Sequence, residues 1–268
     1  MSNPPTLSQA ALAVLQQHEP LEKVRLSFDY AKDWESGKIT SIGKESPPLR
    51  PARPARPELL DPTKMPRRST GKNGRIALLH AIAHIELNAI DLAWDIILRF
   101  SRGEISTEMP KGFFDDWVNV AKDEAAHFKM LNEHLNDLGA QYGDLPAHDG
   151  LWEAAIKSSD DILARLALVP MTLEARGLDT APNTSAKLLA SGDKRTAEIM
   201  RQITDDEISH VAAGVRWFEH ICKIRKIEPI AHFHELLKSR FKGQLKPPFA
   251  HDLRARAGMD IGYYDQVS

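Results

Sequence analysis

Two copies of one short pattern constrain this chain more than any other feature. Asp-Glu-x-x-His occurs at residues 123–127 and again at residues 206–210. Both copies lie in sequence with helical periodicity, so the Glu and the His project from one face of a helix. Each copy therefore offers a carboxylate and an imidazole to a metal ion. Two such copies predict a centre that holds two metal ions.

The composition is that of an ordinary soluble protein. The 268 residues are 42% hydrophobic and 27% charged, with a net charge of −2, which gives no overall basic field for nucleic acid or a membrane surface. The single Cys222 excludes an intrachain disulfide and favours a reducing compartment. No apolar run reaches about 18 residues, and the N-terminus lacks a secretory pattern. We therefore expect a cytoplasmic protein without membrane contact.

Hydrophobic periodicity predicts an all-α protein with four long helices, at about 69–100, 110–138, 158–178 and 193–224. The first is expected to begin at Ser69, Thr70 or Asn73, and the second lies between Pro110 and Gly139. In the third, Pro170 predicts a kink or a junction between two shorter helices. A loop with a short helix is expected over residues 177–191.

Both ends of the chain extend beyond these helices. Residues 1–69 predict a short helix from Leu7 to about Gln17, then a Pro- and Arg-rich extended arm at 46–57. Residues 226–268 predict a helical tail. The arm's basic residues suit either an extended segment that lies over the protein surface or a contact with an acidic partner or RNA. No aromatic residues interleave with them, which weakens the second alternative. The predicted domains are therefore 1–69, 70–225 and 226–268.

Two further carboxylates lie in the apolar stripes of the predicted helices. Glu86 belongs to the first helix and Glu174 to the third, and buried carboxylates are rare unless they are paired or bind metal. His80 and His84 are about 120° and 160° from Glu86 around the helix. We therefore expect these histidines either on the polar face of the helix or behind the metal ligands, where they would contact the ligands and not the metal.

The complete predicted ligand set has one Glu from each of two helices and Glu-x-x-His from each of the other two: Glu86, Glu124, His127, Glu174, Glu207 and His210. This is the ligand pattern of di-iron and di-manganese carboxylate proteins. Carboxylates and imidazoles suit iron or manganese, and two divalent cations neutralise four buried glutamates. The six ligands would also be the catalytic residues.

Each Glu-x-x-His follows an aspartate that could act from behind the ligands. Metal-bound His usually donates its second N–H to an acceptor. Asp123 is predicted to accept from His210, and Asp206 from His127. The alternative is that both are ordinary exposed helix charges.

The chain resembles the ferritin-like di-iron carboxylate superfamily. The stretch 79–86, the pair Trp94-Asp95 and the stretch 123–128 are most similar to a bacterial ferritin-like family of uncharacterised function, over about residues 70–225. The resemblance implies an antiparallel four-helix bundle with a di-iron centre. The 50 residues from Glu124 to Glu174 suit one long crossover. A branch of tRNA-modifying hydroxylases is similar in size and ligand pattern.

Three functions follow from this reading. The leading one is an O2-dependent oxidoreductase, a hydroxylase or oxidase, with two iron ions (manganese is the alternative) and an unknown small-molecule substrate. No flavin, nicotinamide or P-loop fingerprint occurs, so an external electron donor is expected. The second is non-catalytic iron binding or peroxide protection. The third is a tRNA-modifying hydroxylase acting on RNA. A homodimer is the candidate assembly.

Overall fold

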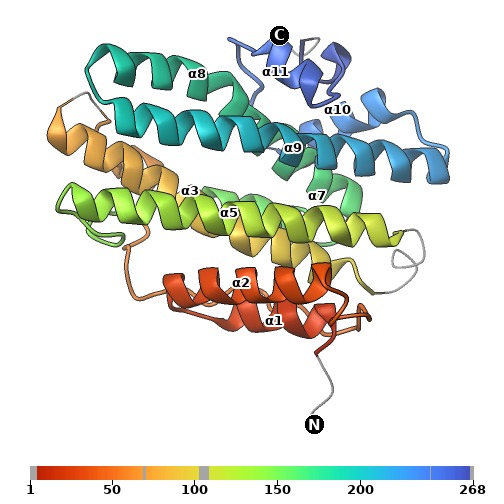
Figure 1. The fold of residues 1–268 in the computed structure, drawn as a ribbon. Helices are drawn as coiled ribbons and strands as arrows, with labels where there is room; N and C mark the ends of the chain where they lie inside the picture. Colours follow the sequence, from red (N-terminus) through yellow and green to blue (C-terminus); the bar gives the residue numbers. More distant parts are fainter. Residues whose placement is uncertain (1–4, 69–70, 103–108, 242, 266–268) are drawn as a thin grey trace. The chain divides into compact units, whose positions relative to one another are not determined.

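The computed structural model describes residues 5–68, 71–102, 109–241 and 243–265 (Figure 1). These residues form helices and no strand; Leu59 and Ala147 make one isolated β-bridge. The predicted all-α class is confirmed. The chain divides into two compact units, Met1–Trp152 and Glu153–Ser268, and each is described by itself. The division predicted from the sequence, at residues 69 and 225, stays a prediction.

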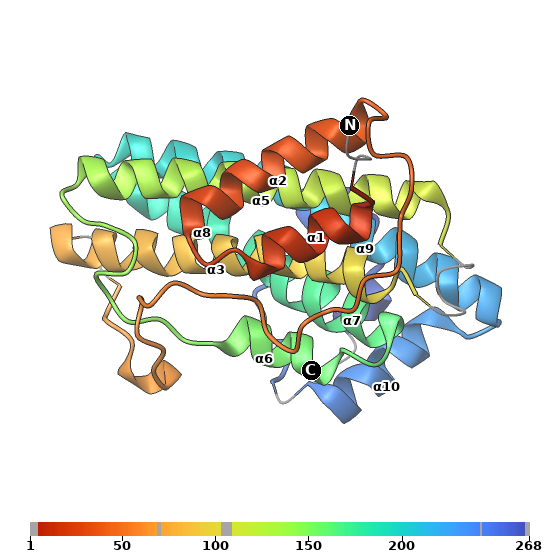
Figure 2. The ribbon, with the colours of Figure 1, turned by 90° about the horizontal axis from the view of Figure 1, so that it is seen from below.

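The first unit is built on a pair of long helices. α3 (Lys72–Arg99) and α5 (Lys111–Asp137) pack along each other, with α1 (Leu7–Gln16) against α3 and α2 (Pro20–Glu35) against α5 (Figure 2). The short helix α6 (Gly150–Lys157) crosses the boundary between the units. The helix in residues 7–17 is confirmed, while α2 lies in a segment that the sequence left unassigned.

Local signals set the ends of these helices. Thr6 caps α1, accepting from the Gln9 backbone N–H, and Gln9 returns a side-chain bond to Thr6. α5 begins directly after Pro110, and Gly139 follows its end with φ +78°. Gly71 stands at the N-cap of α3; the alternative caps Ser69 and Thr70 lie outside the described residues.

α3 is buried on every side along nearly half of its length. All residues from Glu86 to Leu98 are buried, which is typical of a helix in the centre of a domain. By length and composition α3 could cross a membrane, with a mean hydropathy of 1.4 over its most apolar window. However, 78% of that window is buried within the protein, as expected for a core helix.

The Pro- and Arg-rich arm is fixed to the first unit by its own arginines. Arg50 pairs with Asp149 at 2.5 Å, and Arg53 pairs with the buried Asp91 at 2.7 Å. The Ala52 backbone N–H donates to the Leu15 carbonyl at 2.7 Å. The arm therefore lies over the surface of the first unit, which was the first of the two interpretations of its basic residues.

The second unit contains α7 (Ile162–Leu168), a π-helical turn (Val169–Glu174), α8 (Ala175–Ala190) and α9 (Lys194–Arg225). The loop predicted at 177–191 is wrong, because α8 continues through Pro182 to Ala190. Pro182 removes one backbone donor, but α8 packs along α9 and buries Leu178, Ala181 and Leu188. That burial outweighs the missing hydrogen bond.

The C-terminal tail belongs to this second unit. Asp193 caps α9 and accepts from the Thr196 N–H at 3.1 Å, at the residue where the fourth long helix was predicted to begin. α10 (Pro229–Arg240) packs on α7 and α9, and α11 (His251–Arg256) packs on α8 and α9. A short 3-10 helix, Ile261–Tyr263, completes the tail.

Candidate metal centre

Three of the predicted ligands meet inside the first unit. Glu124 and His127 lie one turn apart on α5, with His127 Nδ1 3.5 Å from Glu124 Oε2. Glu86 on α3 approaches the same imidazole, with its Oε2 3.2 Å from His127 Nδ1. Two carboxylates and one ring nitrogen therefore converge from two helices on one point.

These three side chains form a candidate metal-binding cluster. One ligand atom from each lies within 4.8 Å of those of the others. The exposed fraction is 3% for Glu86 and 0% for Glu124 and His127. Because the cluster is closed to bulk water, its charges need compensation from within the protein or from a bound cation.

The pKa of Glu86 also indicates that the buried charges need compensation. Burial raises the pKa of Glu86 well above its ordinary value, and the nearby Glu124 carboxylate raises it further. The hydrogen bond with His127 acts against this shift. A buried pair of carboxylates therefore holds a proton when nothing else neutralises it, and a divalent cation is the alternative.

The second unit repeats the Glu-His geometry on α9. His210 Nδ1 lies 3.5 Å from Glu207 Oε2, the separation also found between His127 and Glu124. Glu207 is 9% exposed and His210 is fully buried. In both motifs Nδ1 is thus the imidazole nitrogen next to the carboxylate.

Glu174 is the last residue of the π-helical turn, and it is partly exposed. Pro170 has no N–H to donate within α7, and the Thr172 hydroxyl donates to the Ala167 carbonyl at 2.7 Å. Gly214 on α9 makes room for this turn, since an added Cβ would lie 2.6 Å from Cβ and Cγ of Pro170. The break expected at Pro170 therefore takes the form of a widened turn.

Comparison of the chain with models of protein families identifies one family. The model of the family "Protein of unknown function (DUF455)" matches residues 16–265. The chain belongs to the DUF455 family.

One relative extends this finding. An "Uncharacterized protein" of Haemophilus influenzae is 44% identical to this DUF455 chain over 212 residues, which cover 76% of the chain and 72% of the relative. No solved structure matches the chain.

The two aspartates predicted to lie behind the histidines occupy equivalent places in this DUF455 protein. Asp123 on α5 and Asp206 on α9 are both half-buried. Each was predicted to serve the histidine of the other motif, and the two motifs belong to different units. Both assignments stay predictions.

Of the two places predicted for His80 and His84, the polar face of the helix is wrong, and a position behind the metal ligands stays a prediction. The exposed fractions of the two histidines are 1% and 6%, because this part of α3 is covered by the segment that follows α5. Tyr142 stacks on both rings, and its hydroxyl lies 2.8 Å from His84 Nδ1. Burial lowers the pKa of His84 to about 3, so its ring is neutral.

Two further residues near these histidines, Tyr142 and His148, were not predicted from the sequence of this DUF455 chain. The His148 carbonyl lies 3.2 Å from His84 Nε2. Both residues come from a turn-rich connection without helical periodicity, which gives no signal of contact with α3. The apolar residues around His80 and His84 were the one available sign that no polar face exists there.

Proposed function

We propose that this chain is a dinuclear metal carboxylate protein with a ferritin-like antiparallel four-helix bundle. In this proposal α3 and α5 supply one pair of helices, and α7–α8 and α9 supply the other. The ligands are Glu86, Glu124, His127, Glu174, Glu207 and His210. The observation that carries the proposal is the buried cluster of two carboxylates and one imidazole on α3 and α5.

The chemistry of the donor set supports metal binding. Oxygen and imidazole donors suit iron and manganese, whereas thiolates would favour zinc or iron–sulfur clusters. The matched Nδ1 to Oε2 separation of 3.5 Å in both motifs supports equivalent roles for them. Two divalent cations would neutralise four glutamates. Iron is our first choice and manganese the alternative.

The ligands differ in how firmly the protein holds them. Glu86, Glu124 and His127 lie on regular helices and are buried, so their positions are fixed by packing. Glu174 ends a π-helical turn and is partly exposed. We infer that Glu174 is the carboxylate that changes its binding mode when substrate enters.

The proposed activity is that of an O2-dependent oxidoreductase, a hydroxylase or an oxidase. Two bound ferrous ions would supply the reduction of O2, and electrons would come from an external donor protein. The chain's own residues hold the ions and keep bulk water away from Glu124 and His127, which are fully buried. The substrate is a small molecule in the leading version of the proposal.

Metal content tests the site. We expect about two iron ions per chain in protein from iron-replete cells, measured by elemental analysis. Glu124→Gln and Glu207→Gln change one ligand in each unit without changing side-chain size. Matched controls are Glu133→Gln on α5 and Glu198→Gln on α9, whose side chains are 64% and 63% exposed.

The pattern of losses distinguishes one shared centre from two separate sites. If the centre is shared, each ligand variant loses most of both ions, while the controls keep them. Loss of metal in Glu124→Gln with full retention in Glu207→Gln would contradict a shared centre. Absence of transition metal from the wild type would overturn the proposal.

Uptake of O2 by the iron-loaded protein in the presence of a reductant tests the proposed activity. Consumption of O2 indicates an oxidoreductase, and its absence indicates a protein that only binds iron.

Iron storage or peroxide protection without a substrate is the second candidate. A storage shell needs helix faces that pack against other copies, and α1 and α2 cover part of α3 and α5 here. This covering favours an enzyme over a shell. Size-exclusion chromatography with mass measurement decides, since a shell elutes as a large particle and a monomer or homodimer does not.

The RNA-modifying alternative rests on the basic arm. Arg50 and Arg53 are already paired with Asp149 and Asp91, which leaves less positive charge for phosphates. This lowers the support for an RNA substrate. Copurification of RNA, with binding that weakens steeply as salt rises, would restore it.

A further inference from the structure

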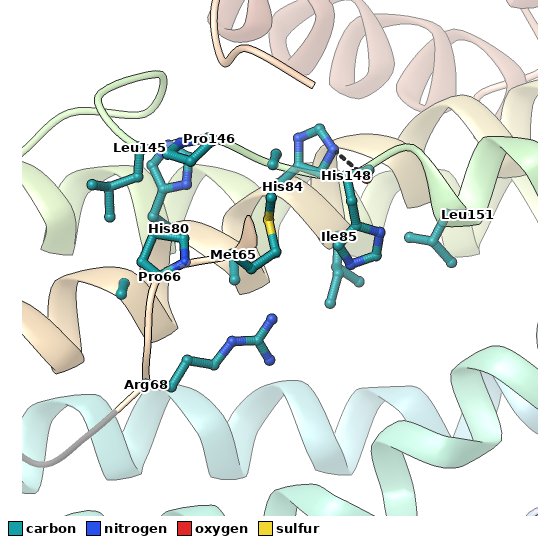
Figure 3. A pocket seen from close by; sticks show the side chains of 13 residues that line it. Met65, Pro66, Arg68, His80, His84, Ile85, Leu145, Pro146, His148 and Leu151 are labelled. Carbon is teal, nitrogen blue, oxygen red and sulfur yellow. Dashed lines mark hydrogen bonds between the residues drawn. The ribbon is translucent and has the colours of Figure 1, made fainter. Parts of the chain in front are cut away.

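A pocket in the first unit lies apart from the cluster of carboxylates. It opens between α3, the segment at residues 65–68 that precedes α3, and residues 145–151 (Figure 3). It contains about 470 Å³ of space that atoms do not fill, open solvent at the mouth included. Met65, Ile85, Leu145 and Leu151 are among the apolar side chains of its walls.

Three histidines line the same pocket, and backbone hydrogen bonds fix two of them. The Gly143 N–H donates to His80 Nε2 at 2.9 Å. The Gly150 N–H donates to His148 Nδ1 at 3.2 Å. A neutral imidazole has one donor and one acceptor nitrogen. His80 therefore carries its proton on Nδ1, and His148 carries its proton on Nε2.

These tautomers decide which ligands the pocket accepts. A metal ion needs an unprotonated ring nitrogen, and on His80 and His148 that nitrogen already faces a backbone N–H. Both nitrogens of His84 are also engaged, with Tyr142 and with the His148 carbonyl and Asn88. The histidines thus offer N–H donors and no free lone pair.

A positive charge stands at the edge of the pocket. Arg68 lines it and is exposed, and within the described residues its guanidinium meets no carboxylate. No Asp or Glu is among the described residues that line the pocket. The N–H groups of His80 and His148 likewise meet no acceptor in the described chain. The pocket therefore combines three donors, one of them charged, with apolar walls.

We propose that this pocket binds a small organic carboxylate, with the charge of Arg68 and an N–H of one lining histidine at the carboxylate and the apolar walls around its carbon chain. His80 and His148 lie toward opposite ends of the pocket (Figure 3), so each marks one candidate place for the carboxylate. Carboxylates accept two or more hydrogen bonds and pair well with guanidinium. The apolar walls favour a carbon chain over an inorganic anion. The proposal does not depend on the proposed metal centre, although Ile85 of the wall directly precedes Glu86.

Calorimetric titration of the full-length protein tests the proposal, with butyrate as the probe and butyramide as its uncharged counterpart. We expect butyrate to bind once per chain, and butyramide to bind about tenfold more weakly or worse, because it lacks the charge. Acetate should bind more weakly than butyrate. Phosphate binding in place of butyrate would mean an inorganic anion site and would overturn the proposal.

Two neighbouring arginines provide a matched pair of variants. Arg68→Gln removes the charge that lines the pocket, and Arg67→Gln removes an equally exposed charge that does not. We expect Arg68→Gln to weaken butyrate binding by about tenfold and Arg67→Gln to leave it nearly unchanged. Equal effects of the two variants would reveal a general charge effect and overturn the site.

Nitrogen-15 NMR of the histidine rings provides an independent check. At neutral pH we expect His80 protonated on Nδ1 and His148 protonated on Nε2. The shift of the histidine that donates to the carboxylate should move when butyrate is added. A proton on His80 Nε2 would contradict the donor arrangement. Unchanged histidine shifts at saturating butyrate would place any binding elsewhere.

Discussion

The two helices that supply a single glutamate each differ in regularity. Glu86 lies in the middle of α3, which is buried on every side from Glu86 to Leu98 and has no interior proline. Glu174 ends a π-helical turn that contains Pro170, and it is partly exposed. The same predicted role is thus carried by one rigid helix and by one interrupted helix. The two halves of a repeated ligand pattern can therefore differ in how freely their glutamate side chains move.

The two helices share a second feature, an aspartate five residues after the glutamate. Asp91 on α3 pairs with Lys23 of α2 and with Arg53 of the arm. Asp179 on α8 pairs with Arg254 of the C-terminal tail at 2.7 Å. In each unit a buried aspartate therefore attaches a terminal segment to the helix that carries the glutamate. Each aspartate meets two cations, because Arg176 of α8 also lies 3.4 Å from Asp179.

The largest effect should come from breaking these buried pairs. Asp91→Ala leaves Lys23, which is 1% exposed, without its anion; burial already lowers the pKa of Lys23, and Asp91 opposes that shift. We expect a loss of about 3–5 kcal/mol in the free energy of unfolding. Asp179→Ala should cost less, about 2–4 kcal/mol, because Arg254 keeps Met259 and the rings of Phe249 and Tyr264.

Urea unfolding curves measure both losses. Asp29→Ala is the control, since Asp29 pairs with Arg25 at the surface with 56% of its side chain exposed. That variant should lose less than about 1 kcal/mol. If Asp91→Ala costs no more than Asp29→Ala, the arm and α2 are not attached through this residue.

A smaller effect should come from filling the space beside the π-helical turn. In Gly214→Ala the new Cβ would lie 2.6 Å from the Pro170 ring, and we expect a net cost of about 1–2 kcal/mol. Gly177→Ala in α8 is the matched control, because nothing lies within 4 Å of its added Cβ. That control should gain up to about 1 kcal/mol from helix propensity. If Gly214→Ala raised the free energy of unfolding as Gly177→Ala does, Gly214 would not be needed for this packing.

The smallest effect should be a pH dependence in the first unit. Burial lowers the pKa of His80 below its ordinary value of 6.5, and the charge of Asp144 opposes that shift. Below pH 6.5 the unfolded chain therefore binds a proton that the folded chain does not. Stability from this histidine is complete above that pH and falls by at most about 1.4 kcal/mol per pH unit below it. His80→Gln should remove this part of the slope in urea unfolding between neutral and mildly acidic pH; identical slopes would contradict the assignment.

Helices with strong local signals were the predictable part of the fold. Asp193 caps α9, and Pro110 and Gly139 bound α5, as their sequence positions indicate. α2 was not assigned, because Pro20 at its start is followed by a mixed pattern of aromatic and charged residues. α8 was mistaken for a loop because Gly177 and Pro182 weaken its local preference, while its packing on α9 is not visible in the local sequence.

The helical class, most helix ends and the candidate ligands follow from local sequence, since periodicity and capping act over a few residues. Only the tertiary structure decided that Glu86, Glu124 and His127 meet in one buried cluster. It also decided the form of the turn at Pro170, the burial of His80 and the attachment of the arm through Asp91. Each of these depends on partners far away in the chain, and their positions follow from the packing of whole helices.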